Sequence, residues 1–148
     1  MYVKLTDGTV SRFPYSLGQL KADNRNVSFP PVPTAETLAE YKVFSVVRST
    51  PPACDSLTHR LTQGVVKLDG VWTEIWTEVE LPEDEASENI RNKRNARLAT
   101  CDWTQLADSP LDADSKAAWA LYRESLRRVP QQAGFPWNVQ WPSEPGTN

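Results

Sequence analysis

The sequence predicts an α+β chain, and three observations lead to this fold class. Two runs of alternating residues meet at Asp69-Gly70, which is typical of a β-hairpin. After about residue 82 the alternation gives way to two helical patterns. The 148 residues include 12 prolines and 6 tryptophans, so short elements and a core rich in indole rings are expected. We therefore expect an N-terminal α+β domain at 1–82 and a helical domain at 83–148.

Short elements are expected in the N-terminal domain before the hairpin. Serine and threonine ahead of apolar periodic residues are good helix N-caps, because their hydroxyls accept a backbone N–H bond. β-Branched and aromatic runs favour strands. The expected elements are a strand at 2–5, a turn at Asp7-Gly8, helices capped by Ser16 and Thr34, and a strand at 42–47.

The hairpin is expected to have a defined register. Asp-Gly tolerates the positive φ that both positions of a type I′ turn require. Antiparallel pairing then places Lys67 opposite Trp72 and Gln63 opposite Trp76. Successive side chains alternate between the two faces, and we assign the aliphatic face to the core. The predicted core face comprises Val71, Thr73, Ile75, Thr77, Val79 and Leu81, and the other face comprises Trp72, Glu74, Trp76, Glu78 and Glu80.

Trp72 and Trp76 are the candidate partner-binding residues of the hairpin. They share a face that otherwise carries glutamates. Tryptophan is enriched at the centres of protein interfaces. Cover by another part of the same chain is the alternative, and a cation–π contact from Lys67 to Trp72 would be part of it. The two interpretations have equal weight.

The second half is expected to form two helices, at 83–100 and 112–129. Acidic residues after Pro82 suit a helix N-terminus, and Asp112 suits an N-cap. Arg94 falls within the apolar stripe of the first helix, so we expect its stem to be buried, and we include it among the candidate partner-binding residues. The stripes comprise Ile90, Leu98 and Cys101 in the first helix, and Ala118, Trp119, Tyr122, Leu126 and Val129 in the second.

The C-terminal segment alternates aromatic and polar residues. Phe135, Trp137, Val139 and Trp141 are all odd-numbered, so an extended segment would place them on one face. We expect this ribbon to lie across the helical hairpin and to cover its small core.

Few features of the sequence suggest chemistry. The single histidine, His59, and the cysteines Cys54 and Cys101 do not have the spacing of a zinc site or of a nucleophile and base. There is no phosphate-binding loop. We predict no catalytic residue, no metal and no cofactor. The net charge of −3 argues against nucleic acid, and no run of about 18 apolar residues predicts a membrane span. The start `MYVKLTDGTV` is not a secretory signal, so the cytosol is expected.

The C-terminal residues resemble a known family. The stretch `RNKRNARLATCDWTQLADSPLDADSKAAWALYRESLRRVP`, followed by `FPWNVQWPSEP`, is similar to the C-terminal domain of the phage tail assembly chaperone family. The characteristic positions are Asp102, Trp103, Asp108, Pro110, Trp119, Tyr122, Arg123 and Trp141. The N-terminal stretches `YSLGQLKADNRNVSFP`, `LAEYKVFSVV` and `DGVWTEIWTEVEL` look like the leader region of small proteins associated with phage tail fibres.

The resemblance implies a tail-morphogenesis protein that is not an enzyme. It implies that Trp103, Trp119, Tyr122 and Trp141 form the core of a small helical module, and that Asp102 and Asp108 are caps. We expect Arg123 to pair with one of these two carboxylates. The implied partner is the tail fibre or another tail or baseplate protein, and a homo-oligomer stays open. The implied location is the host cytoplasm during assembly, or the tail of the mature virion.

Three functions remain in competition. The first is an assembly factor that binds a tail protein, with the fibre favoured, and assists its folding or attachment. The second is a permanent structural adaptor that links fibre and baseplate. The third is an enzyme that uses the region of Asp102 and Asp108, in which case Asp102→Asn would abolish turnover without changing stability.

Overall fold

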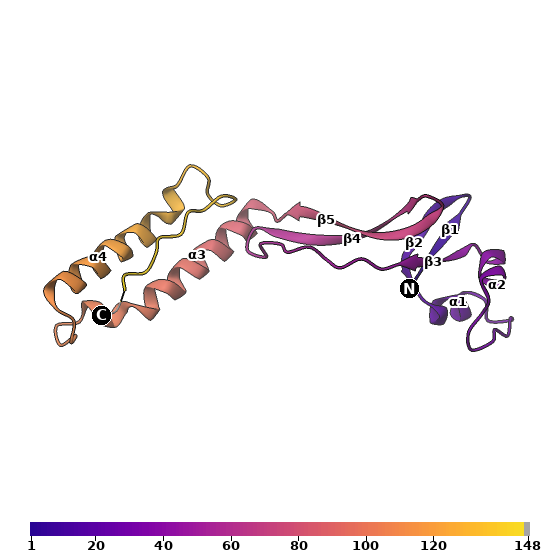
Figure 1. Cartoon of the computed structure of the whole chain (residues 1–148), viewed down its shortest axis with the longest axis horizontal. Helices are drawn as coiled ribbons and strands as arrows, with labels where there is room; N and C mark the ends of the chain where they lie inside the picture. Colours follow the sequence, from indigo (N-terminus) through magenta and orange to yellow (C-terminus); the bar gives the residue numbers. More distant parts are fainter. Residues whose placement is uncertain (147–148) are drawn as a thin grey trace. The chain divides into compact units, whose positions relative to one another are not determined.

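The computed structural model describes residues 1–146 and confirms the α+β class. Five strands lie in the N-terminal half and two long helices in the C-terminal half (Figure 1). Two compact units are present. The sheet unit comprises residues 1–53 and 61–78, and the helical unit comprises residues 54–60 and those from Val79 on. The domain boundary between residues 82 and 83 stays a prediction.

The sheet unit is built on one mixed sheet. Its strands are β1 (Tyr2–Thr6), β2 (Thr9–Tyr15), β3 (Val43–Val47), β4 (His59–Leu68) and β5 (Val71–Glu80). They lie in the order β2-β1-β3-β5-β4. β1 pairs antiparallel with both β2 and β3, whereas β3 runs parallel to β5 with Val46 beside Trp72. The strand β2 was not among the predicted elements, because its sequence `TVSRFPY` includes a proline.

Two short helices contribute to the core of the sheet unit. α1 (Leu17–Asp23) begins with a capping box in which Ser16 accepts from the N–H of Gln19, and α2 (Ala35–Glu40) is capped by Thr34. Both predicted caps are therefore confirmed. Leu20 from α1 and Leu38 from α2 pack with Tyr15 and Val43 of the sheet, and all four are buried.

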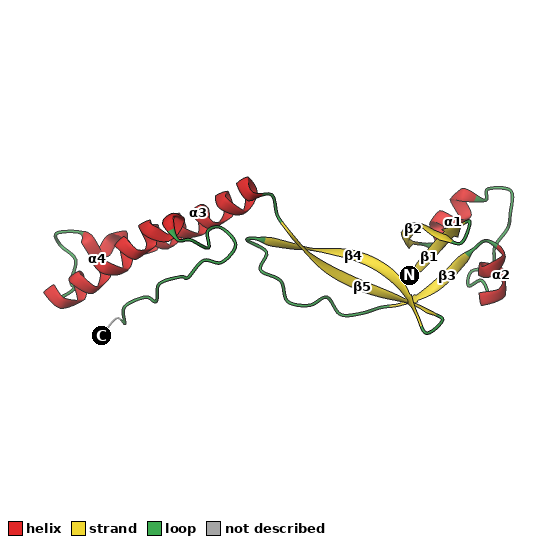
Figure 2. Cartoon of the chain, turned by 90° about the horizontal axis from the view of Figure 1, so that it is seen from above, coloured by secondary structure: helices red, strands yellow, loops and turns green. Residues whose placement is uncertain are grey.

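The hairpin of β4 and β5 closes at Asp69 and Gly70, as predicted (Figure 2). Their φ values of 47° and 85° are both positive, as a type I′ turn requires. Only Gly and a few polar residues adopt this conformation at low cost, which explains the Asp-Gly pair.

The core face predicted for β5 is wrong. Val71, Ile75 and Val79 are 50%, 38% and 38% exposed, whereas Glu74 on the opposite face is only 4% exposed. Leu81, just past the end of β5, is the buried member of the predicted face. The reason is tertiary, because the segment after β3 lies against the face of Glu74 and hydrogen-bonds to it.

A polar cluster in the sheet unit surrounds Asp23 at the end of α1. Its carboxylate accepts from Lys4 Nζ at 2.7 Å and from the Tyr15 hydroxyl at 2.8 Å, and Arg12 lies 3.3 Å away. The bond from Lys4, followed by the bond from Tyr15, lowers the pKa of Asp23 from 3.8 to about 2. The carboxylate thus ties α1 to β1 and β2 in its ionised form.

Acid is expected to weaken the sheet unit through Asp23. A depressed pKa gives stability that is present above the unfolded value of 3.8 and is lost as the pH falls towards about 2. Asp23→Asn should therefore reduce the dependence of the urea midpoint on pH between 4 and 2. An unchanged dependence in this variant would contradict the role given to Asp23.

The helical unit consists of two helices and two short 3₁₀ turns. α3 spans Glu83–Thr100 and α4 spans Ala113–Arg128, close to the predicted ranges. The 3₁₀ turns are η1 (Asp102–Gln105) and η2 (Val129–Gln131). Asp112 caps α4 by accepting from the N–H of Ser115 at 2.7 Å, as predicted. The core comprises Cys101, Trp119, Tyr122 and Leu126, with Leu98, Leu111 and Trp141 packed against it.

The ribbon predicted for the C-terminal segment is only partly correct. Residues 133–137 form a turn, in which the N–H of Asn138 donates to the carbonyl of Gly134 at 2.6 Å. A side chain at Gly134 would collide with the carbonyl of Asn138, so this turn requires glycine. Residues 139–146 have no regular secondary structure and run beside the helices (Figures 1 and 2).

Candidate partner-binding surfaces

The hairpin has one covered face, which is organised around Glu74. Its carboxylate accepts from the backbone N–H of Ser49 at 2.9 Å and from the side-chain amide of Gln63. The bond from Gln63, followed by the bond from Ser49, lowers the pKa of Glu74 below its ordinary value of 4.5. A buried charge is tolerated when it is hydrogen-bonded, so Glu74 fixes the segment after β3 to β5.

Trp72 and Trp76 lie on this covered face and are half-buried. The Lys67 ammonium lies 5.9 Å from the centre of the Trp72 ring, as expected for the local cation–π contact. Trp72 also lines a 250 Å³ groove together with Leu38 and Val43. The indole N–H of Trp76 donates to the Ser49 carbonyl at 3.4 Å. The chain itself therefore supplies part of their cover, and their partner-binding role stays a prediction.

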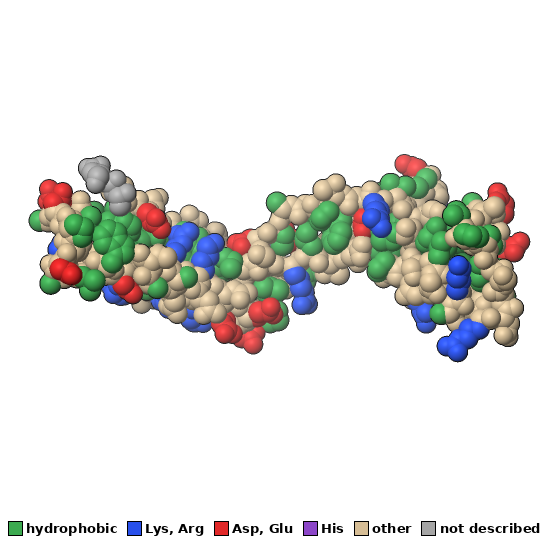
Figure 3. Space-filling model, turned by 90° about the horizontal axis from the view of Figure 1, so that it is seen from below, with side chains coloured by type: hydrophobic (Ala, Val, Ile, Leu, Met, Phe, Trp, Pro, Cys, Tyr) green, Lys and Arg blue, Asp and Glu red, His purple; other side chains and the backbone are tan. Residues whose placement is uncertain are grey.

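The other side of the hairpin presents an open face, formed by Val47, Leu68, Val71 and Ile75. Their exposed fractions are 55%, 51%, 50% and 38%. Apolar side chains reach the surface in the hairpin region (Figure 3). No charged residue of segments 61–68 and 71–78 shares this face. On β4 the side chain of Lys67 points to the side opposite to that of Leu68, and on β5 the side chains of Glu74 and Glu78 point to the side opposite to those of Val71 and Ile75. An uncharged aliphatic surface on a sheet is a typical protein-binding surface.

Arg94 lies half-buried on α3, as predicted. Its Nε is buried and has no hydrogen-bond partner within residues 1–146. Neighbouring cations of α3 are used inside the helical unit: Lys93 and Arg97 lie 5.3 Å and 4.6 Å from the Trp141 ring. The basic residues thus hold the C-terminal segment on α3, a role that the charge pattern alone did not reveal.

Arg123 joins the two long helices. Its guanidinium donates to the Leu98 carbonyl at 2.9 Å and lies 2.7 Å from the Asp102 carboxylate. The Arg123 side chain is 10% exposed, whereas that of Asp102 is 65% exposed. The expected pairing with Asp102 is present. The prediction that Asp102 caps a helix is wrong, because the turn that it begins has no side-chain cap bond.

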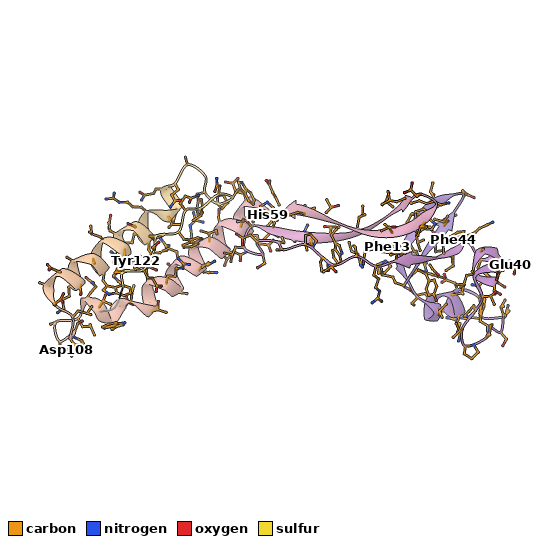
Figure 4. The ribbon with its side chains drawn as sticks, viewed as in Figure 1. Phe13, Glu40, Phe44, His59, Asp108 and Tyr122 are labelled. Carbon is orange, nitrogen blue, oxygen red and sulfur yellow. The ribbon has the colours of Figure 1, made fainter. Side chains whose placement is uncertain are left out.

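The connection between α3 and α4 exposes another part of the family motif. Trp103 is 42% exposed and Leu106 is 56% exposed, so Trp103 is not the core residue that was predicted. Thr104 is buried in its place, and its hydroxyl donates to the Cys101 carbonyl at 2.7 Å. Asp108 and Pro110 are exposed, and Asp108 makes no cap bond within residues 1–146. Figure 4 shows Asp108 at this connection and Tyr122 midway along α4.

His59 makes its contacts within the helical unit. His59 Nδ1 lies 2.8 Å from the Thr58 hydroxyl. The imidazole ring meets the Trp137 ring edge-on, with the ring centres 6.3 Å apart. No group of three or more His, Cys, Asp or Glu side chains in residues 1–146 could hold a metal ion. Nor does that part of the chain include a helix that is long and apolar enough to cross a membrane.

These contacts define an α+β protein whose helical unit is a small packed module with exposed apolar surface. The family model described as phage tail assembly chaperone protein matches residues 87–146, which is 60 of the 148 residues. The resemblance of the C-terminal region to the phage tail assembly chaperone family is therefore confirmed. Comparisons with curated proteins and with solved structures give no match. The resemblance of the N-terminal stretches stays a prediction.

Sequence reasoning missed the open face for an identifiable reason. Both faces of β5 carry large apolar side chains, Trp72 and Trp76 on one and Val71 and Ile75 on the other. Alternation shows that two faces exist but not which one is covered. The available signal was Glu74 with Gln63, since a polar pair can be buried when each partner satisfies the other.

Proposed function

We propose that this chain is a phage tail morphogenesis protein that binds a tail protein, with the tail fibre as the favoured partner, and assists its folding or attachment. The single observation that carries this proposal is the match of residues 87–146 to the tail assembly chaperone family. The chain acts in the host cell during assembly. It works by binding and uses no catalytic residue.

The open face supports this proposal. Unassembled fibre chains expose apolar surface and strand edges, which aggregate unless another chain covers them. A sheet face with four exposed aliphatic side chains, and with no charged residue of segments 61–68 and 71–78 on it, offers complementary cover. Trp72 and Trp76 lie on the opposite face, where they contribute to the stability of the hairpin and leave only part of their surface exposed to a partner.

The binding surface is tested by a pair of double variants in the full chain. Val71→Thr with Ile75→Thr should weaken binding to the purified tail fibre of the same phage by roughly tenfold, because about 1–2 kcal/mol of apolar burial is lost. The urea midpoint should stay nearly unchanged, since these side chains are 50% and 38% exposed. Trp72→Ala with Trp76→Ala should lower the midpoint.

Leu121→Thr is the matched control, because Leu121 is an exposed aliphatic residue on α4 (71%). It should leave fibre binding unchanged. Equal affinity of wild type and the Val71/Ile75 variant would rule out the open face as the binding surface. Loss of binding in the tryptophan variant without a change in midpoint would move the surface to the other face.

A permanent adaptor between fibre and baseplate is the second candidate, and the exposed aliphatic face also favours it. Stable adaptors bury large, partly apolar interfaces, whereas a chaperone must release its partner. Quantitative mass spectrometry of purified particles separates the two functions. A fixed ratio of this chain to the fibre protein supports the adaptor, and its absence beside abundant fibre supports the chaperone.

A further inference from the structure

We propose that β4 pairs antiparallel with β4 of a second copy of this chain, so that two five-stranded sheets become one continuous sheet. The observations are an unpartnered edge, a central stretch of that edge with neither proline nor charge, and a sequence that is complementary to itself. This proposal is independent of which tail protein the chain binds.

The outer edge of β4 has no neighbour in the described chain. β4 is the last strand in the sheet order, and it is ten residues long. Leu68 and Val71 flank a two-residue turn and therefore form a hydrogen-bonded pair with each other. Consequently Leu61, Gln63, Val65 and Lys67 direct their backbone N–H and C=O groups away from β5. The turn and loop hydrogen bonds of residues 1–146 involve none of these four residues.

The opposite edge of the same sheet is protected. β2 includes Arg12 and Pro14, and a proline or a charge at an edge prevents pairing with another chain. β2 is also irregular: from Tyr2 to Lys4 the partner strand advances three residues, from Tyr15 to Arg12, rather than two. Such bulges are another protection. The segment 61–66 of β4 has no proline and no charged residue, and the charges of the pairing segment stand at its two ends, at Arg60 and Lys67. One edge is blocked and the other is open, which indicates that the open edge is used.

A second copy fits this edge because its sequence is self-complementary. If a two-fold axis passes at Gly64, each of the nine residues of 60–68 lies opposite a residue of the same segment in the other copy. Lys67 then lies opposite Leu61 of the other copy, and Gln63 lies opposite Val65, so no like charges meet. The two copies of Gly64 meet in a non-hydrogen-bonded pair, where Cα atoms approach to about 4.5 Å. In each copy the Ile75 side chain already occupies the space over Gly64. The pairing also makes the two open faces continuous.

Wild-type protein provides the first test. Sedimentation equilibrium over a range of concentrations should give a dimer that dissociates on dilution. Amide exchange measured by NMR should slow with rising concentration at Leu61, Gln63 and Val65. It should be independent of concentration at Val66 and Leu68, whose amides are bound to β5 in either state.

Val65→Pro provides the second test. It removes one outward N–H from each copy, hence two hydrogen bonds from the dimer, and a proline is tolerated at a free edge. The dissociation constant of the dimer should rise by at least about tenfold. Val65→Thr keeps the N–H and the β-branched shape, so its dissociation constant should stay close to that of wild type.

Three outcomes overturn the proposal. The first is a monomer at every concentration with fast exchange at Leu61, Gln63 and Val65. The second is a dimer that Val65→Pro and Val65→Thr affect equally. The third is protection of the same amides by added tail fibre while the chain itself stays monomeric, which would assign the edge to that partner instead.

Discussion

Trp119→Ala is expected to destabilise the helical unit by about 3–5 kcal/mol, because it removes a large buried aromatic side chain and leaves a cavity. Trp119 is 7% exposed and meets Tyr122 edge-on, with ring centres 5.6 Å apart and an angle of 83° between the planes. The pair lies at the centre of the core formed with Cys101 and Leu126. Urea denaturation followed by circular dichroism at helical wavelengths measures the loss.

Two further substitutions define what the Trp119 result means. Leu121→Ala, on the same helix but 71% exposed, should cost no more than about 0.5 kcal/mol. Trp119→Phe should cost far less than Trp119→Ala, because it keeps a ring and removes an indole N–H that is buried without a partner in the described chain. If Trp119→Ala and Leu121→Ala had equal effects, the core described for the helical unit would be incorrect.

Arg123→Ala is expected to lower the free energy of unfolding by about 2–4 kcal/mol, since it removes a buried, charge-assisted hydrogen-bond donor and leaves a cavity between the two helices. The principal acceptor is the Leu98 carbonyl in the last turn of α3, which would keep only the longer bonds from the Cys101 N–H at 3.2 Å and the Cys101 thiol at 3.3 Å. Cys101 Sγ, 3.2 Å from the guanidinium, is a second acceptor in the buried core. The urea midpoint of the full-length variant provides the measurement.

Asp102→Asn is the matched control for Arg123→Ala. The Asp102 side chain is 65% exposed, so its ion pair with Arg123 is screened by solvent and should contribute less than about 1 kcal/mol. A larger loss for Asp102→Asn than for Arg123→Ala would contradict this asymmetry. An activity abolished by Asp102→Asn at unchanged stability would instead favour the enzyme hypothesis.

Local sequence patterns predicted most elements of this chain and the ends of its long helices, but not the strand β2. Asp69-Gly70 supplies two residues that tolerate positive φ, and Asp112 supplies the oxygen that caps α4. These signals depend on neighbouring atoms, so the sequence is enough to predict them. The α4 stripe of Trp119, Tyr122 and Leu126 was predicted for the same reason, because helical periodicity fixes which residues share a face.

The family motif could also be recognised in the sequence, but the burial of each of its residues could not be predicted from it. Trp103 and Trp119 are both tryptophans of that motif, yet one is 42% exposed and the other is 7% exposed. Residue type gives the tendency to be buried. The turn at Asp102–Gln105 decides the outcome, since it buries Thr104 instead of Trp103.

Only the tertiary structure decided which face of the hairpin is open. Both faces of β5 are apolar enough to be buried, and the segment after β3 covers the one that includes Glu74. Ser49 and Gln63 satisfy that carboxylate, and they lie 25 and 11 residues from it in the chain. The parallel pairing of β3 with β5 brings Ser49 to Glu74, and the hairpin of β4 and β5 brings Gln63 to it. The sequence thus determined the elements through local chemistry, whereas contacts between distant residues decided which surfaces remain free to bind.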